Sequence, residues 1–248
     1  MTAPRVAFVT GGSSGIGRAI AERLAADGMR IVIAARDVAR AEAVAAEIAG
    51  ASAVRCDVTE RASVAAAREQ VGAVDVLVTN AGFDEFEPFL DTDPAGWERL
   101  IAVNLYGVLH CAHVFAPALV ARCRETGFGR IVNIASDAGR VGSTGEAVYS
   151  AAKGGVIAFT KSLARELARH GVTVNAVCPG PTETPMMDAI VATDFGGKVI
   201  ERIVAASPRR RMSRPEEIAG AVAYFAGEEA GFVTGQVLSV SGGLTMAG

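Results

Sequence analysis

Short runs of apolar residues, many of them β-branched, alternate along the chain with longer stretches in which apolar residues recur at helical spacing. Short apolar runs bounded by turn residues are typical of buried strands, whereas a recurrence at the helical period predicts helices. The predicted strands are Val6–Thr10, Arg30–Ala34, Ala53–Cys56, Val74–Val78, Arg130–Ala135, Val172–Val177 and Val237–Val240. The predicted helices are Gly15–Asp27, Ala39–Ala49, Arg61–Val71, Gly96–Arg122, Val148–His170 and Glu216–Ala226.

This alternation of strand and helix predicts the fold class. Near-continuous apolar strands joined by helices indicate a parallel sheet that is covered on both faces. Right-handed crossovers then give an α/β doubly wound Rossmann fold, which we expect to be one seven-stranded domain spanning residues 1–248. Ligands of such folds bind outside the carboxyl ends of the strands.

One long segment interrupts the alternation. Residues 181–214 follow a strand and precede the next helix, and they mix Met, Ile, Val and Phe with charged residues. A connection of this length is uncommon in a compact domain and is often a functional lid. We therefore expect a substrate lid at about residues 181–214, with a surface helical hairpin that has no ligand role as the alternative.

Composition and charge argue against several classes of function. Half of the residues are apolar, only 6% are aromatic, and the formal net charge is −3. Without a dense Lys/Arg cluster or aromatic platforms, nucleic-acid binding is not expected. No apolar run approaches the roughly 18 residues of a membrane span, and the N-terminus does not resemble a secretory signal. We expect no membrane partner.

The chain has four scattered cysteines: Cys56, Cys111, Cys123 and Cys178. They form no CxxC pair, which predicts reduced thiols in a cytoplasmic protein. His110, Cys111 and His113 have the residue types of a metal site, but their spacing matches no zinc signature. Because they lie in an apolar helical stretch, packing is the favoured interpretation and no metal is expected.

The first predicted strand runs directly into TGGSSGIG. A strand that passes through glycines into a helix binds phosphate, because the helix N-terminus presents free N–H groups and partial positive charge. Gly11 lets the chain turn, Gly15 lets the backbone approach a pyrophosphate, and Gly17 lets the helix pack on the sheet. Ser13 and Ser14 are expected to cap the helix or to bind phosphate. The spacing is not the common GxGxxG, so a turn without a ligand is the alternative.

Arg36 and Asp37 follow the second predicted strand, where dinucleotide-binding folds recognise the adenosine ribose. An acidic residue there favours NAD, and a basic residue favours the 2′-phosphate of NADP. Asp37 stands where the next helix needs an N-cap, so capping is its favoured role. Arg36 can bind a phosphate through two parallel hydrogen bonds, which favours NADP(H) over NAD(H).

Polar and small residues also follow the ends of the third and fourth predicted strands. Asp57 is placed either to bond the adenine amine or to cap the next helix. Asn80, Ala81 and Gly82 follow the fourth strand, where small residues allow a flat ring to lie against the backbone.

Ser136 ends the fifth strand, and Tyr149 and Lys153 follow in AVYSAAKGG. Residues four apart on a helix share one face, so Tyr149 and Lys153 are neighbours. A nearby ammonium stabilises a phenolate, so Lys153 is expected to lower the pKa of Tyr149 from its usual value of about 10. Ser136 is placed to donate to a substrate carbonyl. Each of these residues, taken alone, is more often structural. Their occurrence together and in this order indicates proton transfer to or from a carbonyl oxygen.

The stretches TGGSSGIG, TNAG, VNLYG, NIAS, YSAAK and CPGPTET resemble the short-chain dehydrogenase/reductase family essentially from end to end. The resemblance implies hydride transfer between a nicotinamide cofactor and a secondary alcohol or ketone. It implies that Tyr149 is the general acid/base, that Lys153 lowers its pKa and binds the nicotinamide ribose, and that Ser136 polarises the carbonyl. Asn104 would hold a water molecule of a proton relay. The further cofactor contacts expected are Ile16, Val58, Pro179, Gly180, Thr182 and Thr184.

Three stretches, SDAGRVGSTGEAVY, GFDEFEPF and GFVTGQVLSVSGGLTMAG, resemble the branch of this family that oxidises 2-hydroxycyclohexanecarboxyl-CoA. The expected substrate is therefore a hydroxyacyl or oxoacyl thioester of CoA or of acyl carrier protein. The alternatives are a 3-oxoacyl-[acyl-carrier-protein] reductase and a non-catalytic dinucleotide sensor. The resemblance also implies a homotetramer, with the last strand and the long helices at its interfaces.

Several charged residues near these motifs carry weaker expectations. Four arginines offer cations to a CoA phosphate, although solvated or intersubunit roles are commoner: Arg209, Arg210, Arg211 and Arg214. Asp84, Glu85 and Glu87 follow the NAG turn near the expected cleft, where a solvated loop is favoured and contact with substrate is the alternative. No functional role is expected for Asp137 and Glu146.

Overall fold

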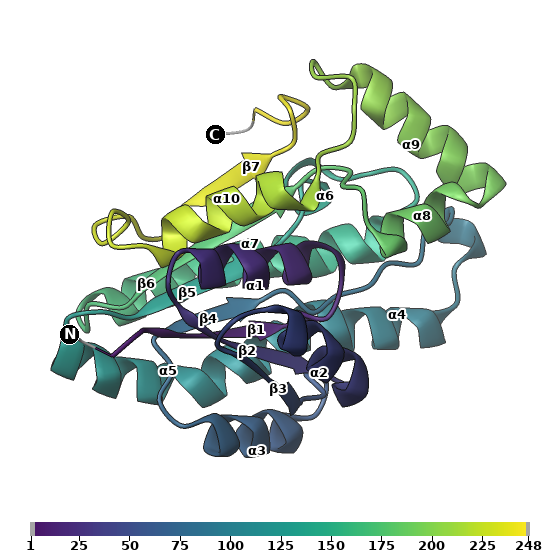
Figure 1. Ribbon diagram of the computed structural model, residues 1–248. Coiled ribbons are helices and arrows are strands. Elements are labelled where there is room, and N and C mark those ends of the chain that lie inside the picture. The colour runs from purple at the N-terminus through teal and green to yellow at the C-terminus, as the bar shows by residue number, and fades with distance from the viewer. Residues whose placement is uncertain (1–2, 247–248) are drawn as a thin grey trace.

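A seven-stranded parallel sheet, in the order β3-β2-β1-β4-β5-β6-β7, organises the chain (Figure 1). The structure is a computed structural model that describes residues 3–246. Its strands are β1 (Val6–Thr10), β2 (Arg30–Ala35), β3 (Ala51–Arg55), β4 (Val76–Thr79), β5 (Arg130–Ile134), β6 (Thr173–Pro179) and β7 (Val237–Val240). The predicted doubly wound fold is confirmed, and the seven strands were placed to within a few residues.

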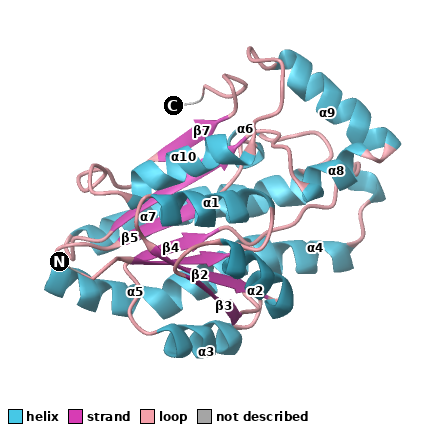
Figure 2. Ribbon diagram, viewed as in Figure 1, coloured by secondary structure: helices cyan, strands magenta, loops and turns pink. Residues whose placement is uncertain are grey.

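Helices cover both faces of the sheet (Figures 1 and 2). One face carries α1 (Gly15–Ala26), α2 (Val38–Glu47) and α10 (Pro215–Ala226). The other carries α3 (Arg61–Val71), α5 (Gly107–Thr126) and α7 (Ala147–Ala168). Successive strand residues point to opposite faces, so Val9 packs with the first group and Phe8 with the second. The sheet is therefore buried on both sides, which explains why its strands lack polar alternation.

The helix predicted over residues 96–122 begins earlier, ends later and is interrupted. α4 (Pro94–Ile101) starts where Asp93 accepts a hydrogen bond from Ala95 N at 3.2 Å, and α5 ends before Gly127 at φ +72°. Between them a π-helical turn spans Ala102–Tyr106. Such a turn inserts a residue into the helical period, so a periodic pattern cannot reveal it, and it is frequent at functional sites.

The continuous helical stretch Pro94–Thr126 is long and apolar enough, by length and composition, to cross a membrane. Within this fold it serves as a core helix. Cys111, Phe115 and Leu119 are buried against the sheet, and the Phe115 ring lies 4.5 Å from the ring of Phe8 between centroids.

Residues 181–214 form two helices, α8 (Pro185–Val191) and α9 (Asp194–Ala206), beyond the carboxyl edge of the sheet (Figure 1). Thr184 and Thr193 begin them by accepting hydrogen bonds from Met187 N at 3.2 Å and Gly196 N at 3.0 Å. These caps could be read from the sequence, because threonine is a favoured N-cap residue. Two further short elements, the 3₁₀ turn Phe89–Asp91 and α6 (Ala138–Val141), were not predicted.

A buried hydrogen-bond chain ties α7 to the centre of the sheet. Thr79 Oγ1 donates to Asn133 Oδ1 at 2.7 Å, and Asn133 Nδ2 donates to Thr160 Oγ1 at 2.9 Å. Thr160 Oγ1 donates in turn to Val156 O at 2.8 Å. All three side chains are buried, so the chain satisfies polar atoms that water cannot reach. It sets the position of the helix that carries Tyr149.

We expect Asn133→Ala to lower the free energy of unfolding by about 2–4 kcal/mol, because two buried hydroxyls lose their partner and a cavity forms. Urea unfolding followed by circular dichroism measures the change. Thr79→Ser keeps the hydroxyl and is the control, with a loss of about 1 kcal/mol for one methyl group. Equal destabilisation by the two variants would show that the hydrogen bonds of Asn133 contribute nothing to the free energy of unfolding.

Candidate active site

A cavity of about 1110 Å³ lies along the carboxyl ends of the strands and reaches the lid helices. It runs from the glycine turn after β1, past the ends of β2 to β5, to α8 and α9. Here β1 and β4 are neighbours although β2 and β3 lie between them in sequence. A crevice at such a switch point is where doubly wound folds bind ligands.

The glycine turn has the backbone that its predicted role requires. Gly11 and Gly15 have φ values of +65° and +50°, which side chains disfavour. A Cβ atom on Gly17 would lie 2.2 Å from Gly11 O, so α1 approaches the turn as closely as backbone allows. Ser14 occupies the N-cap of α1 without a capping hydrogen bond from its side chain. Its hydroxyl is therefore left for a ligand at the helix N-terminus.

Asn80 and Thr10 connect the glycine turn to the end of β4. Thr10 Oγ1 accepts hydrogen bonds from Asn80 N at 2.9 Å and Ala81 N at 3.0 Å. The Asn80 side chain donates to Thr10 O at 3.0 Å and to Gly11 O at 3.3 Å. These bonds hold the two chain segments together, and they give Asn80 a structural role that sequence reasoning missed.

The second and third strands end in charged residues that line the far end of the cavity. Asp37 caps α2 by accepting from Arg40 N at 3.1 Å, as predicted. Arg36 and Arg40 are exposed and both line the cavity; Arg40 was not predicted. Asp57 also lines the cavity, but it does not cap α3. Its Oδ1 accepts instead from Thr59 N at 3.0 Å and Thr59 Oγ1 at 2.7 Å.

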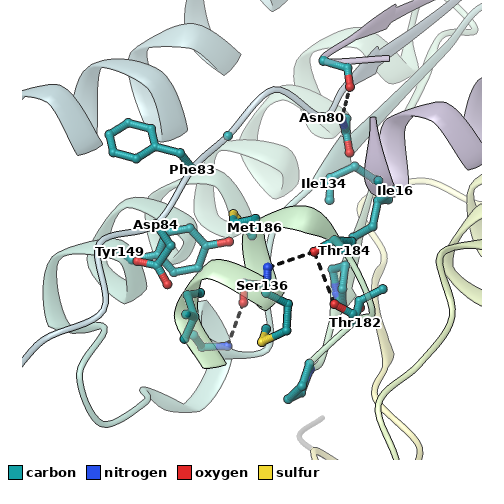
Figure 3. A pocket seen from close by; sticks show the side chains of 18 of the residues that line it. Ile16, Asn80, Phe83, Asp84, Ile134, Ser136, Tyr149, Thr182, Thr184 and Met186 are labelled. Atoms are coloured by element: carbon teal, nitrogen blue, oxygen red, sulfur yellow. Dashed lines mark hydrogen bonds between the residues drawn. The ribbon is translucent and has the colours of Figure 1, made fainter. Parts of the chain in front are cut away.

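Ser136 and Tyr149 lie together in the wall of the cavity (Figure 3). Ser136 follows β5, and its Oγ accepts a hydrogen bond from Ala138 N at 3.1 Å at the start of α6. Tyr149 stands in the first turn of α7 and is 9% exposed. The predicted juxtaposition of these two hydroxyls is therefore present in the folded chain.

Lys153 and Asn104 do not line the cavity; both are buried directly behind Gly82. A Cβ atom on Gly82 would lie 2.7 Å from Asn104 Oδ1 and 3.5 Å from Lys153 Nζ. Lys153 Nζ donates to Ile134 O at 3.0 Å, and Asn104 Nδ2 donates to Phe83 O at 2.7 Å. Asn104 Oδ1 is buried and accepts from no described group. That orphaned oxygen beside an ammonium suits a bound water molecule.

The pKa of Tyr149 corrects one expectation. Burial raises it well above its usual value, the charges of Asp84 and Glu146 raise it further, and a hydrogen bond with Ser136 opposes them. Lys153 Nζ lies 5.6 Å from the centroid of the tyrosine ring, and burial lowers the pKa of this lysine to about 8. In the free protein burial is the largest influence on the pKa of Tyr149, and the expected lowering is not seen.

Asp84 and Glu146 line the cavity beside Tyr149, where a solvated loop and no role were expected. Burial and the neighbouring Glu146 raise the pKa of Asp84 to about 9. Burial also raises the pKa of Glu146. Glu85 turns away and pairs with Arg99 at 2.9 Å, so only one of the two adjacent acids belongs to the site.

The lid contributes an apolar wall. The residues of α8 and α9 that line the cavity include Met186, Met187, Ile190, Val199, Ile200 and Ile203. Phe86 and Phe195 pack together with their ring centroids 6.0 Å apart, and a Cβ on Gly145 would touch both. The lid and the two loops that follow β4 and β5 thus meet at one point, which favours the lid interpretation over an unrelated surface hairpin.

The CPGPTET stretch of the sequence forms part of this wall. Pro179, Gly180, Thr182 and Thr184 all line the cavity. Thr182 is buried and its Oγ1 bonds Ser213 Oγ at 2.8 Å, which ties the start of the lid to its end.

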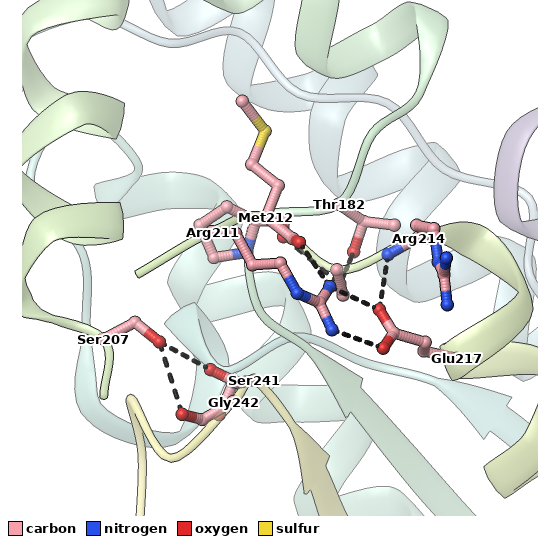
Figure 4. Close-up of polar contacts among 10 residues, drawn as sticks. Thr182, Ser207, Arg211, Met212, Arg214, Glu217, Ser241 and Gly242 are labelled. Atoms are coloured by element: carbon pink, nitrogen blue, oxygen red, sulfur yellow. Dashed lines mark hydrogen bonds and ion pairs between the residues drawn. The ribbon is translucent and has the colours of Figure 1, made fainter. Parts of the chain in front are cut away.

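The four arginines suggested for CoA lie elsewhere. None of them lines this cavity, and Arg211 pairs with Glu217 at 2.6 Å (Figure 4). The cation that the lid does bring to the cavity is Arg202 on α9. Among the other candidates, His110 donates to Val58 O at 3.0 Å and Cys111 is buried in the core, as the packing interpretation expected.

Comparisons with known proteins agree with this geometry. A family model described as enoyl-(acyl carrier protein) reductase matches residues 11–245. The acetoacetyl-CoA reductase of Allochromatium vinosum is 41% identical over 98% of this chain and 99% of its own. The 3-oxoacyl-[acyl-carrier-protein] reductase FabG of Escherichia coli is 38% identical over 98% of both chains. The solved ligand-free structure of Thermoplasma acidophilum aldohexose dehydrogenase is 32% identical, covers 99% of this chain and 95% of that one, and superposes with a TM-score of 0.86.

The chain therefore belongs to the short-chain dehydrogenase/reductase family. It is an oxidoreductase of that type, acts on CH–OH groups and uses a nicotinamide cofactor. The residues present fit such a cofactor, because the glycine turn, the unused Ser14 hydroxyl and the close-packed Gly82 leave a cradle along the sheet edge.

We expect Gly82→Ala to weaken binding of the nicotinamide cofactor by about tenfold or more, since the added methyl group displaces the Asn104 side chain behind it. Isothermal titration calorimetry measures the affinity. Gly220→Ala is the control, because a Cβ on that helical glycine lies 3.7 Å from its nearest neighbour, Arg23 Nη1. Unchanged affinity in Gly82→Ala would contradict the tight packing seen at this position.

Proposed function

We propose that the protein is an NADP(H)-dependent reductase of oxoacyl thioesters, which also oxidises the corresponding hydroxyacyl thioesters. The observation that carries the proposal is the meeting of Ser136 and Tyr149 in the cavity wall, at the sheet edge that holds the glycine turn. Two hydroxyls at that place can bind one carbonyl oxygen from two sides.

Tyr149 is the general acid in reduction and the general base in oxidation. When bound, the nicotinamide supplies a hydride to the carbonyl carbon or accepts one from it. Tyr149 gives its phenolic proton to the carbonyl oxygen, which becomes the alcohol, and Ser136 holds that oxygen by a hydrogen bond. The burial of Tyr149 suits proton donation, because it keeps the phenol protonated.

Lys153 and Asn104 restore the proton after reduction. Their polar atoms lie together behind Gly82, and the free oxygen of Asn104 can hold a water molecule beside the lysine. With a pKa of about 8, Lys153 exchanges protons near neutral pH. Its closeness to Gly82 supports the further role of binding the nicotinamide ribose.

Arg36 supports NADP(H) as the preferred cofactor. Arg36 is exposed at the cavity, whereas the neighbouring Asp37, which also lines the cavity, accepts the capping hydrogen bond of α2. Arg40 adds a second cation on the same side.

The thioester substrate is supported by two kinds of observation. The acetoacetyl-CoA and 3-oxoacyl-[acyl-carrier-protein] reductases align over nearly the whole chain. The Met, Ile and Val side chains of the lid offer apolar contact to an acyl chain or ring. A 2-hydroxycyclohexanecarboxyl-CoA substrate stays a prediction from the sequence motifs. Arg202, and not the arginines after residue 208, is the lid cation that lines the cavity and is available to a CoA phosphate.

We also propose a homotetramer in the cytoplasm. Phe232, Leu238 and Met246 are exposed apolar residues around the last strand, and Tyr106 is exposed at the start of α5. Such residues suit subunit interfaces. Ala247 and Gly248, the end of the motif expected there, lie outside the described residues. The four free, buried cysteines suit a reducing compartment.

The proposal is tested by following the reduced cofactor spectrophotometrically with acetoacetyl-CoA, a cyclic 2-oxoacyl-CoA, an enoyl-CoA and an aldohexose. We expect turnover of at least one oxoacyl thioester, and a loss of about 10³-fold or more in kcat for Tyr149→Phe with NADPH binding retained. Tyr224→Phe on α10 is the control, because that residue is exposed and does not line the cavity. Turnover of the enoyl-CoA alone, or an active Tyr149→Phe variant, would refute the proposed reaction.

Cofactor choice is tested separately. We expect Arg36→Asp to reduce the kcat/KM ratio of NADPH over NADH by about 10–100-fold, because it removes the phosphate partner and adds a partner for ribose hydroxyls. Arg68→Asp on α3 makes the same change of charge away from the cavity and is the control. A ratio in Arg36→Asp equal to that of the unmodified protein would reject Arg36 as the determinant.

A further inference from the structure

The lid presents one charged side chain to the cavity. Arg202 of α9 lines the cavity together with Val199, three positions before it, and Ala206, four positions after it. Residues at that spacing share one face of a helix, so Arg202 stands on the side of α9 that faces the cavity. The other charged residues of the two lid helices do not line it: Asp188, Asp194, Lys198 and Glu201.

The guanidinium of Arg202 has no protein partner within residues 3–246. It is exposed, and it makes no ion pair or hydrogen bond with a described group. Two other exposed arginines are engaged, since Arg99 pairs with Glu85 and Arg211 pairs with Glu217. An unpaired guanidinium among the apolar lining residues of the lid helices can offer two parallel N–H groups to an anion that enters the cavity.

Contacts at both ends hold α9 in place. In its first turn, the ring of Phe195 packs on Phe86 of the loop after β4, with the centroids 6.0 Å apart. Just beyond its last turn, Ser207 Oγ donates to Ser241 O at 3.4 Å and to Gly242 O at 3.3 Å, after β7 (Figure 4). The helix therefore keeps its cation at the cavity before a substrate arrives, which lowers the entropic cost of binding.

The place of α9 decides which anion Arg202 can bind. The phosphates of a nicotinamide cofactor are served by the glycine turn after β1 and by Arg36 after β2. In the sheet, β1 and β2 lie on one side of β4, whereas β5, β6 and β7 lie on the other. Because the ends of α9 are fixed to segments after β4 and β7, the helix spans that second half. An anion bound there belongs to the substrate rather than to the adenosine end of the cofactor.

The other charged residues that line this half of the cavity are acids. Asp84 follows β4, Asp137 follows β5, and Glu146 directly precedes α7. Ionised carboxylates repel an anionic group, whereas a guanidinium attracts it. Among the described residues that line this half, Arg202 is therefore the cation available to a phosphate.

We propose that Arg202 binds the phosphate of a phosphopantetheine thioester and thereby selects substrates carried on coenzyme A or on an acyl carrier protein over uncharged ketones. Both carriers join the pantetheine arm to a phosphate, so they share the group that Arg202 recognises. The inference rests on the proposed reduction of oxoacyl thioesters, and it names the part of the substrate by which the lid holds it. Because the phosphate is far from the reacting carbonyl, this contact acts on substrate binding and not on the chemical step.

Two thioesters that differ by one phosphate give the kinetic test: acetoacetyl-pantetheine and acetoacetyl-4′-phosphopantetheine, each reduced with NADPH. We expect a KM about tenfold lower for the phosphorylated thioester and a similar kcat, because a remote charge-assisted contact binds ground state and transition state alike. In Arg202→Gln the two KM values are expected to become equal, with that of acetoacetyl-pantetheine unchanged. A preference for the phosphorylated thioester that survives in Arg202→Gln would overturn the proposal.

Lys198→Gln is the matched control, because it makes the same change of charge on the same helix at an exposed residue that does not line the cavity. It is expected to keep the preference for phosphate. Equal loss in both variants would assign the effect to the general charge of the lid and refute a contact by Arg202. Acetoacetyl-CoA and acetoacetyl-[acyl-carrier-protein] then show, by the larger dependence on Arg202, which carrier the protein uses.

A binding measurement tests the contact without turnover. Coenzyme A is titrated calorimetrically into the protein in the presence of NADP⁺, and we expect an affinity about tenfold lower in Arg202→Gln, with NADP⁺ affinity unchanged. Equal affinity of the two proteins for coenzyme A, or none, contradicts the contact. If no thioester were reduced, the proposed reaction would fail while the titration still decided the role of Arg202. If both thioesters were reduced equally well, the reaction would stand and the role of Arg202 would fall.

Discussion

The close approach of backbone to backbone where β1 and β4 lie side by side is the constraint on which the rest of the site depends. A Cβ atom on Gly11, after β1, would lie 2.9 Å from Ala81 Cα, after β4, and one on Gly17 would lie 2.2 Å from Gly11 O. Thr10 accepts hydrogen bonds from the chain after β4 and holds the two segments at that distance. Only small residues fit such a contact, and it leaves a groove for a flat ligand along the sheet edge.

Burial behind this groove determines the chemistry more than direct pairing of charges does. Lys153 is buried and binds the carbonyl of Ile134, so burial lowers its pKa to about 8, and Tyr149 is kept protonated by the same effect. A lysine near a tyrosine therefore does not suffice to ionise it. An oxidised nicotinamide would bring positive charge to the cavity and favour the phenolate, whereas the charges of Asp84 and Glu146 raise the pKa of Tyr149.

Much of the fold and site could be predicted because it depends on local pattern. Apolar runs placed the strands, the glycines with their positive φ angles marked the turn, and Asp37 was recognisable as a helix cap. The π-helical turn that positions Asn104 could not be predicted, since the hydrophobic period continues through it. The position of Asp84 and Glu146 in the cavity wall was missed as well, because each alone resembles a solvated loop residue.

The sequence by itself determined the class of this protein: the order of its strands and helices, the glycine turn, and the serine, tyrosine and lysine of an oxidoreductase. Those features follow from local conformational preference and from motifs that can be recognised by the spacing of their residues. Only the tertiary structure decided which charged groups share the cavity. It placed Arg202 there but none of the four arginines suggested for CoA, and Asp84 but not Glu85, because desolvation and pairing depend on what packs around each side chain.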